Sequence, residues 1–137
     1  VNMGWKLEVT ARRNIKLRAM MSGLRGQEVE NLIDKVAEES GTRDFLDEPL
    51  RIFSAGMRSR LTFCFTTSYN YDILLLDEWI GAGDKAFQSF VADRINVFTD
   101  SKILVFASHN HKMIKSTCNR FGRMISGQFE EVSEIGD

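Results

Sequence analysis

The sequence predicts an α/β fold, with a helical first part followed by a partial parallel sheet. In residues 27–40, "QEVENLIDKVAEES", apolar side chains recur at i, i+3, i+4, i+7 and i+8, the pattern of a one-sided amphipathic helix. Further along, residues 73–76, "ILLL", and 102–107, "KILVFA", are short apolar runs of strand length. We therefore expect a helical region over 1–69 and an α/β region over 70–137.

The individual elements follow from caps, breakers and periodicity. Thr10 and Ser54 are suited to cap helices, and Gly127 lies between two short extended stretches that predict a terminal hairpin. A helix between the two apolar runs makes them a parallel βαβ unit, with both strands buried on both faces. The expected helices are Thr10 to about Met21, 27–40, Ser54 to about 68–70, Lys85 to about Phe98, and a short one around 110–117.

The bulk composition limits the function classes. The chain has 137 residues, enough for one core, and 18 Lys+Arg against 19 Asp+Glu, so its total charge does not indicate a nucleic-acid partner. No apolar run reaches the roughly 18 residues of a membrane-spanning helix, so we expect any membrane role to be peripheral. Cys64 and Cys118 lie in apolar surroundings without metal-ligand spacing, which is typical of reduced thiols, although sequence alone leaves a disulfide open.

Two carboxylates, Asp77 and Glu78, directly follow the apolar run "ILLL". Ligands of open α/β sheets bind at the carboxyl ends of the strands, and successive residues point in opposite directions. One carboxylate can therefore address a metal while the other addresses a water. An acidic pair in this position is also typical of a solvated loop or a helix cap.

A second candidate is Ser54-Ala55-Gly56, which opens a predicted helix. Unpaired backbone N–H groups, small residues and a hydroxyl together make an anion site, whereas the alternative is an ordinary serine N-cap. His109 follows the run "KILVFA", so we expect it at the same edge of the sheet as Asp77. Asp84 suits a helix cap as well as a functional role, and His111 is expected to be a surface residue.

Taken together, the segments "FSAGM", "DILLLDE", "GAGD" and "FASHN" resemble the signature motif, Walker B strand, D-loop and switch-histidine loop of ABC-transporter ATPase subunits. The segment "LEVTARRNIKLRAMMSGL" and the Ser-x-Gly-Met signature are similar to the branch that exports polysaccharides such as O-antigen, capsule or teichoic acid. The resemblance extends from about Leu7 to Gly127. It implies a P-loop NTPase fold: 1–69 would be the helical subdomain and 70–137 the C-terminal part of the RecA-like ATP-binding core.

The resemblance also implies roles for the matching residues. Asp77 would hold the water shell of Mg²⁺, Glu78 would act as general base on the attacking water, and His109 would contact the γ-phosphate of ATP. The implied cofactor-binding residues are Ser54, Ala55, Gly56, Met57 and Asp84; those of the signature would cap the nucleotide of the opposite subunit, and Asp84 would communicate across the dimer. The implied partners are a second ATPase subunit and a transmembrane permease, with no nucleic acid. The implied location is the cytoplasmic face of the inner membrane.

Several departures from the family pattern are visible. Ala55 replaces the usual Ser or Gly, Tyr71 replaces a proline, Trp79 is bulky for its position, and Arg13 replaces the glutamate of the usual "GREN". None of these removes a reacting group. The larger departure is that the sequence has no G-x-x-x-x-G-K-[ST] and no Gly-Lys pair, so the phosphate-binding loop is expected upstream of Val1.

Two alternatives stay open from sequence. One is a soluble ABC ATPase of another class, although the long coiled-coil insertions and tandem halves of that group are not seen here. The other is a non-catalytic interaction module, which the loss of the phosphate loop favours and the presence of Glu78 and His109 disfavours. If the chain belongs to an ABC transporter or to a soluble ABC ATPase, ATP hydrolysis is a property of the intact protein. We expect this chain alone to be inactive.

Overall fold

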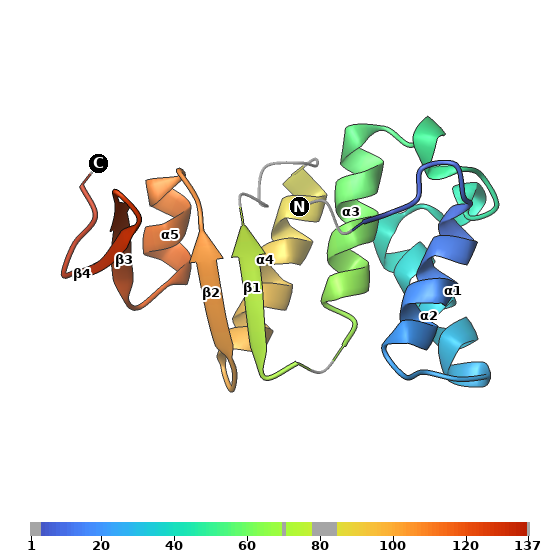
Figure 1. Ribbon diagram of the computed structural model, residues 1–137, viewed down its shortest axis with the longest axis horizontal. Coiled ribbons are helices and arrows are strands. Elements are labelled where there is room, and N and C mark those ends of the chain that lie inside the picture. Colours follow the sequence, from blue (N-terminus) through green and yellow to red (C-terminus); the bar gives the residue numbers. More distant parts are fainter. Residues whose placement is uncertain (1–3, 70, 78–84, 137) are drawn as a thin grey trace. The chain divides into compact units, whose positions relative to one another are not determined.

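The structure is a computed structural model that describes residues 4–69, 71–77 and 85–136. These residues form two compact units, each with its own internal contacts. The first unit holds the chain up to Tyr69 and the beginning of helix α4 as far as Val91, and the second holds strand β1 and the chain from Ala92 onward. Figure 1 labels the elements and colours them along the sequence.

The observed elements agree with the expected helices and strands. The first unit contains helices α1 (Ala11–Met21), α2 (Gln27–Ser40) and α3 (Ala55–Thr66), with two 3₁₀ turns, η1 (Arg43–Phe45) and η2 (Leu50–Ile52), between α2 and α3. Next come β1 (Ile73–Asp77), α4 (Lys85–Thr99), β2 (Ile103–Ala107), α5 (His111–Thr117), β3 (Phe121–Ile125) and β4 (Gln128–Val132). The 3₁₀ turns were not expected, and α3 ends a few residues before the predicted end.

Both predicted serine/threonine caps are formed. The Thr10 hydroxyl accepts a hydrogen bond from the Arg13 amide at 3.2 Å, and the Ser54 hydroxyl accepts one from the Met57 amide at 3.1 Å. Each bond satisfies one of the amides that a helix N-terminus leaves without an intrahelical partner. At the other end of α2, Gly41 takes a left-handed conformation, with φ 66°, a position that favours glycine.

The first unit buries its apolar side chains internally. Helix α2 packs against both α1 and α3, and its predicted apolar stripe is buried throughout. On the far side of α3, the Phe63 ring makes edge-to-face contacts with Phe87 and Phe90 of α4, at centroid distances of 6.1 and 6.2 Å. Such aromatic contacts add to the apolar area that they remove from water. The unit therefore has a continuous core.

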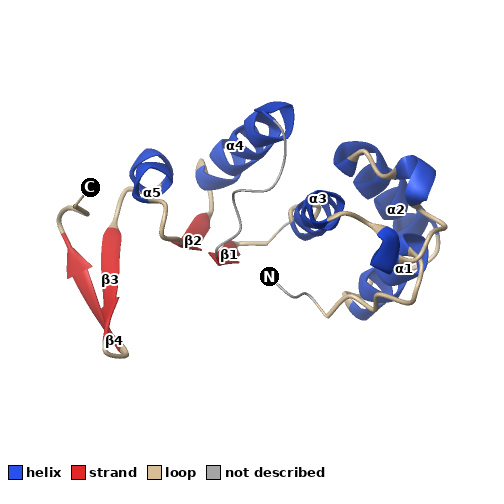
Figure 2. Cartoon of the chain, turned by 90° about the horizontal axis from the view of Figure 1, so that it is seen from above, coloured by secondary structure: helices blue, strands red, loops and turns tan. Residues whose placement is uncertain are grey.

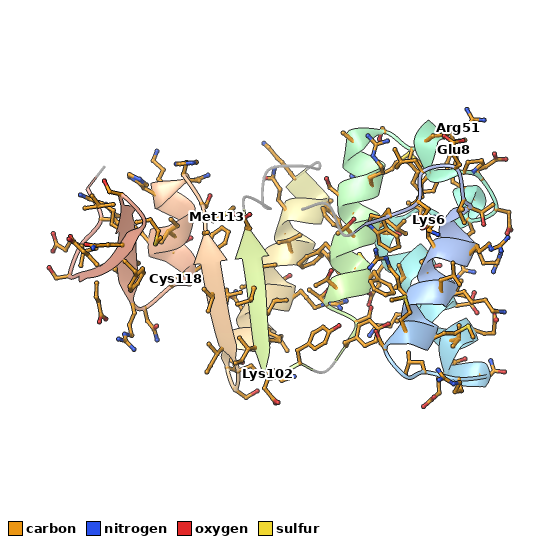
Figure 3. All side chains as sticks on the ribbon, in the orientation of Figure 1. Lys6, Glu8, Arg51, Lys102, Met113 and Cys118 are labelled. Atoms are coloured by element: carbon orange, nitrogen blue, oxygen red, sulfur yellow. The ribbon has the colours of Figure 1, made fainter. Side chains whose placement is uncertain are left out.

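The segment before α1 is tied to the turns before α3 by backbone hydrogen bonds. The amides of Leu50 and Arg51 donate to the carbonyls of Val9 and Leu7, at 3.2 and 2.9 Å. Glu8 and Arg51 add an ion pair at 3.2 Å (Figure 3). This segment is the N-terminal strap, residues 5–10.

Asn14 fixes the inner side of the N-terminal strap. Its buried side chain accepts from the Lys6 amide at 3.0 Å and donates to the carbonyls of Lys6, Val9 and Thr10, at 2.9–3.0 Å. A buried amide is stable only when its hydrogen-bonding groups are satisfied, and here they are. The strap and α1 thus form one polar, well-connected corner.

The second unit contains a parallel strand pair and a hairpin. Strands β1 and β2 are parallel, with Ile73 opposite Ile103 and Asp77 opposite Ala107. Because α4 connects them, they form the predicted βαβ unit. Figure 2 shows α4 and α5 on the same side of this pair.

The prediction that these strands are buried on both faces is wrong for this chain. Leu74 and Leu76 are buried, but the alternate residues point to the other face, which no described element covers. On that face Ile73, Leu75, Ile103 and Val105 have exposed fractions of 54, 71, 58 and 53%. The reason is that α4 and α5 cover one face only, so a continuous apolar run becomes half buried by the alternation of the strand.

The hairpin is antiparallel, as predicted, with Met124 opposite Phe129. The Phe129 ring lies over Gly122, where a Cβ atom would come within 2.1 Å of the ring. A larger residue at position 122 would therefore require the exposed Phe129 ring to move. Arg120 and Glu131 make a two-bond ion pair across the strands, at 2.8 and 3.0 Å.

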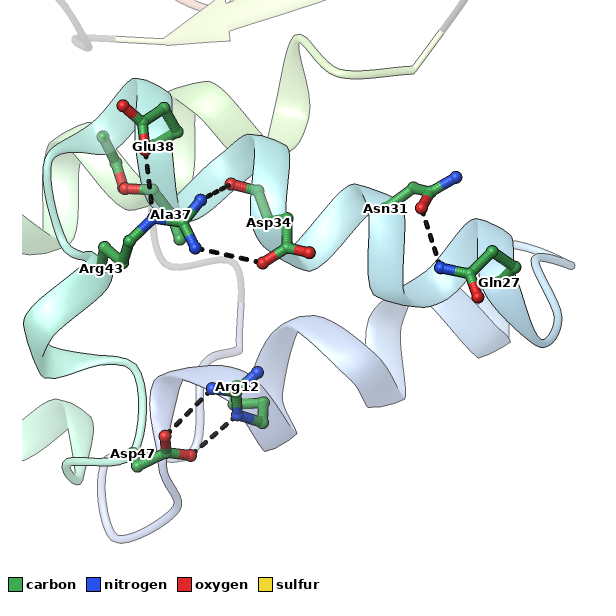
Figure 4. Close-up of polar contacts among 9 residues, drawn as sticks. Arg12, Gln27, Asn31, Asp34, Ala37, Glu38, Arg43 and Asp47 are labelled. Carbon is green, nitrogen blue, oxygen red and sulfur yellow. Dashed lines mark hydrogen bonds and ion pairs between the residues drawn. The ribbon is translucent and has the colours of Figure 1, made fainter.

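Exposed ion pairs line the helices of the first unit. Figure 4 shows Arg12 bonded to Asp47 through two nitrogens, at 2.8 and 3.0 Å, and Arg43 bridging Glu38 and Asp34 of α2, at 3.1 and 3.2 Å. The hydrogen bond from Arg12 lowers the pKa of the Asp47 carboxyl, as the bond from Arg120 lowers the pKa of Glu131. Exposed pairs of this kind contribute little to stability.

Candidate functional site

Asp77 is the last residue of β1, at the carboxyl end of the parallel pair. Its neighbour across the ladder is Ala107, the last residue of β2, so both strands end at the same level. The Asp77 residue is exposed to solvent. The other two carboxylates predicted near it, Glu78 and Asp84, lie outside the described residues.

His109 follows β2 by two residues, so it lies beyond the same edge of the sheet as Asp77. It borders a shallow open hollow that is also lined by Asn110, Lys112 and Lys115. The sequence prediction that Asp77 and His109 share one edge of the sheet therefore agrees with the strand register.

The loop that carries His109 is held by local hydrogen bonds. The Asn110 amide donates to the Ser108 hydroxyl at 3.1 Å, and the Asn110 side-chain oxygen accepts from the Met113 amide at 3.2 Å, which caps α5. His111 Nδ1 lies 2.7 Å from the Gly136 carbonyl oxygen, which fits an Nδ1–H donor. His111 is exposed, as expected, and it ties α5 to the C-terminal segment.

Cys64 is buried in α3, and Cys118 directly follows α5 (Figure 3). The two cysteines are not joined by a disulfide, in agreement with the prediction of reduced thiols, although Cys118 is only partly buried. Burial raises the pKa of the Cys118 thiol, because desolvation penalises the thiolate. The thiol form is thus favoured at neutral pH, which disfavours a nucleophilic role.

The backbone changes from extended to helical between Ser54 and Ala55, where α3 begins. Phe53 is buried, its carbonyl accepts a hydrogen bond from the Arg58 guanidinium, and Ser54 has extended backbone angles before the first helical turn. The amides of Ala55 and Gly56 belong to the first turn, where a helix supplies no acceptor of its own. These two amides and the Ser54 hydroxyl form the candidate anion-binding turn.

Packing among the described residues does not explain Gly56 in this turn. Its φ is not positive, and within the described part of the chain an added Cβ would meet only the Ser54 hydroxyl oxygen, at the ordinary contact distance of 3.8 Å. Glycine in a helix costs up to about 1 kcal/mol relative to alanine. Position 56 therefore has open space outside the helix, into which a ligand or another chain can approach closely.

The residues present fit the cofactors that the motifs imply. No group of three or more His, Cys, Asp and Glu side chains gathers in the described residues to form a complete metal cage. Mg²⁺ at a nucleotide site is commonly held by one or two carboxylates together with phosphate oxygens and waters, and the exposed Asp77 can supply such a carboxylate. A phosphate matches the amides and hydroxyl of the Ser54 turn.

Two structural residues near these sites were missed from the sequence. Asn14 organises the N-terminal strap, and Arg58 holds the Phe53 carbonyl one residue before the Ser54 turn. The only signal for Asn14 was a polar residue on the apolar face of a predicted helix. Asn14 and Arg58 were not among the predicted site residues.

The chain is similar in sequence to ATP-binding proteins of export systems. No protein-family model matches the chain. The chain is 35% identical over 133 residues to the teichoic acids export ATP-binding protein TagH of Listeria monocytogenes, covering 96% of this chain and 40% of that protein. It is 36% identical over 118 residues to the O-antigen export system ATP-binding protein RfbB of Klebsiella pneumoniae, covering 85% of this chain and 48% of that protein.

The fold comparison agrees with the sequence comparison. A solved structure described as the ATP-binding subunit of an ABC transporter superposes with a TM-score of 0.78, at 18% identity, over 93% of this chain and 55% of that chain. The chain thus spans about half or less of the length of the proteins it matches. In sequence, this chain is similar to part of the ATP-binding proteins of teichoic acid and O-antigen export systems, and its fold is that of an ATP-binding subunit of an ABC transporter.

Proposed function

We propose that this chain is part of an ATP-binding and ATP-hydrolysing subunit that drives export of a cell-surface polysaccharide. The observation that carries the proposal is the pairing of Asp77 with Ala107, which puts Asp77 and His109 at one strand edge, in a chain similar to export ATP-binding proteins. Within that subunit, residues 1–69 serve as the helical subdomain and residues 70–137 as the C-terminal part of the ATP-binding core.

The strand edge is the proposed catalytic side of the site. Asp77 holds the water shell of Mg²⁺, which would supply charge neutralisation at the phosphates. Glu78 accepts a proton from the attacking water, and His109 contacts the terminal phosphate. The exposure of Asp77 and the hollow beside His109 support these roles, because both groups are accessible from outside the chain.

The Ser54 turn is the proposed contact with a nucleotide held by a second subunit. The Ser54 hydroxyl and the amides of Ala55 and Gly56 face an anion at the helix N-terminus, and Met57 completes the turn through the bond of its amide to the Ser54 hydroxyl. Gly56, which packing within the described residues does not require, supports a close approach there. Asp84 takes part in the same subunit contact. On this proposal two copies of the intact subunit form a homodimer around ATP.

The proposed setting is the cytoplasmic face of the plasma membrane, bound to a transmembrane permease. None of the helices in the described part of the chain is long and apolar enough to cross a bilayer. Because the sequence has no G-x-x-x-x-G-K-[ST] motif, we expect this chain alone to bind ATP weakly. Tight Mg²⁺-dependent binding of ATP to the 137-residue chain contradicts this expectation.

Glu78→Gln in the full-length protein tests the proposal. We expect ATP turnover to fall roughly 10²–10⁴-fold, the usual scale for loss of a general base, with ATP binding retained. Glu131→Gln, at an exposed carboxylate of the hairpin, is the matched control and should leave turnover unchanged. Normal turnover in Glu78→Gln would exclude the role given to this residue.

A further inference from the structure

The N-terminal strap contacts the chain on both sides of the Ser54 turn. Before the turn, the η2 amides of Leu50 and Arg51 donate to backbone carbonyls of the strap, at 3.2 and 2.9 Å. After the turn, Trp5 of the strap reaches α3, where its indole Nε1–H donates to the Thr62 hydroxyl at 2.8 Å. The strap therefore bridges η2 and α3, the two segments that meet at Ser54.

The Thr62 hydroxyl connects this bridge to the beginning of α3. Thr62 is buried, and its hydroxyl accepts from Trp5 and donates to the Arg58 carbonyl, at 2.8 and 2.7 Å. The Arg58 guanidinium in turn donates to the carbonyl of Phe53, the residue directly before Ser54. A buried group that loses its partner is costly, so this connected set of bonds favours one arrangement of the turn.

The indole ring of Trp5 is held by two different helices. The Arg18 guanidinium of α1 lies 4.8 Å from the centre of the ring, and the Phe65 ring of α3 meets it edge to face, with a centroid distance of 5.5 Å. Both kinds of contact favour a particular orientation of the ring. The ring therefore keeps its Nε1–H directed at Thr62, and a displacement of the strap would be transmitted to α3.

We propose that the N-terminal strap holds the Ser54 turn in its anion-binding conformation, with Trp5 as a positioning residue. This inference rests on the nucleotide contact proposed above for the turn. The Ser54 hydroxyl and the amides of Ala55 and Gly56 can meet a phosphate together only while η2 and α3 keep their relative orientation. Trp5 acts on them through Thr62. Because the nucleotide at this turn is held by the second subunit, the strap affects ATP turnover more than ATP binding.

The test uses full-length protein and the variants Trp5→Phe and Thr62→Val, each of which removes one partner of the hydrogen bond and retains most of the side-chain volume. Each should lower the kcat for ATP about three- to ten-fold, the scale of one hydrogen bond, with the KM changed less than about two-fold. The double variant should lose no more than the weaker single variant, because both changes remove the same bond.

Thr67→Val is the matched control. It removes a hydroxyl that is bonded in the same way to a backbone carbonyl four residues earlier, that of Phe63, and it should leave turnover unchanged. Thermal unfolding followed by circular dichroism shows whether each variant is folded.

Hydrogen exchange measured by mass spectrometry follows the turn directly. In Trp5→Phe and in Thr62→Val, the amides of residues 54–58 should exchange several-fold faster, whereas those of residues 27–40 in α2 should be unchanged. Equal acceleration in both segments would show that the whole unit is loosened, and it would overturn the proposal.

Ser54→Ala separates this inference from the proposed function. If Ser54→Ala lowers turnover while Trp5→Phe and Thr62→Val do not, the turn keeps its role and the strap proposal is overturned. If Ser54→Ala leaves turnover unchanged, the nucleotide contact proposed for the turn is wrong, and the strap proposal is overturned with it. Additive losses in the double variant would show that Trp5 and Thr62 act separately, which also contradicts the proposal.

Discussion

The two units of this chain differ in how completely they bury their apolar residues. In the first unit the apolar stripes of α1, α2 and α3 are buried against one another, and polar groups such as Asn14 are fully bonded. In the second unit one face of the β1–β2 pair stays exposed, with Leu75 and Val105 open to solvent. A helical bundle can close its core with local segments, whereas a parallel sheet needs covering on both faces. The first unit is thus closer to a self-contained folding unit.

A pair of alanine substitutions tests this contrast most strongly. Phe63→Ala removes a fully buried ring that contacts Phe87 and Phe90, so we expect the free energy of unfolding to fall by about 3–5 kcal/mol. Leu75→Ala changes an exposed side chain and should alter it by less than about 0.5 kcal/mol. Urea unfolding followed by circular dichroism measures both. A large loss in Leu75→Ala would mean that the open face of the strands is covered in solution.

Gly56→Ala tests a position in the first unit at which packing among the described residues does not require glycine. The added methyl group has no contact closer than 3.8 Å with the residues that the structure describes, and alanine favours the helix, so stability should rise by up to about 1 kcal/mol. In the full-length protein we expect ATP turnover to fall, because the methyl group occupies the space proposed for the nucleotide. Thermal unfolding and an ATPase assay on the same preparation give both results. Unchanged turnover contradicts the role proposed for this glycine.

The smallest expected effect is on the pH dependence of stability, for which each unit contains a carboxylate with a lowered pKa. Asp47 and Glu131 have lowered pKa values because each accepts hydrogen bonds from an arginine. A lowered folded-state pKa gives stability that is fully present above the unfolded-state value, about 4, and is lost as the pH falls through the folded-state pKa. Asp47→Asn and Glu131→Gln should therefore flatten the loss of stability between about pH 5 and 2. An unchanged pH profile in both variants would contradict the pKa shifts.

Much of the fold could be predicted from the sequence because the signals were local. The stripe of Val29, Leu32, Ile33, Val36 and Ala37 is buried as its period predicts, and the caps at Thr10 and Ser54 form the expected bonds. The exposed strand face and the 3₁₀ turns could not be predicted, since both depend on which distant segments lie nearby. Asp77 and His109 could be predicted to share an edge because two apolar runs separated by a helix indicate a parallel strand pair. The role of Asn14 could not be predicted, because its hydrogen-bonding partners come together only when the N-terminal strap folds.

The N-terminal strap has a consequence for the order of folding. Its hydrogen bonds join Leu7 and Val9 to Arg51 and Leu50, so they close a loop of some forty residues, while α1, α2 and α3 need only neighbouring residues to form. Closing such a loop has an entropic cost that is recovered only when the contacts at its ends are complete. The helices are therefore expected to form first, and the backbone hydrogen bonds that join the strap to Leu50 and Arg51 are expected to form last.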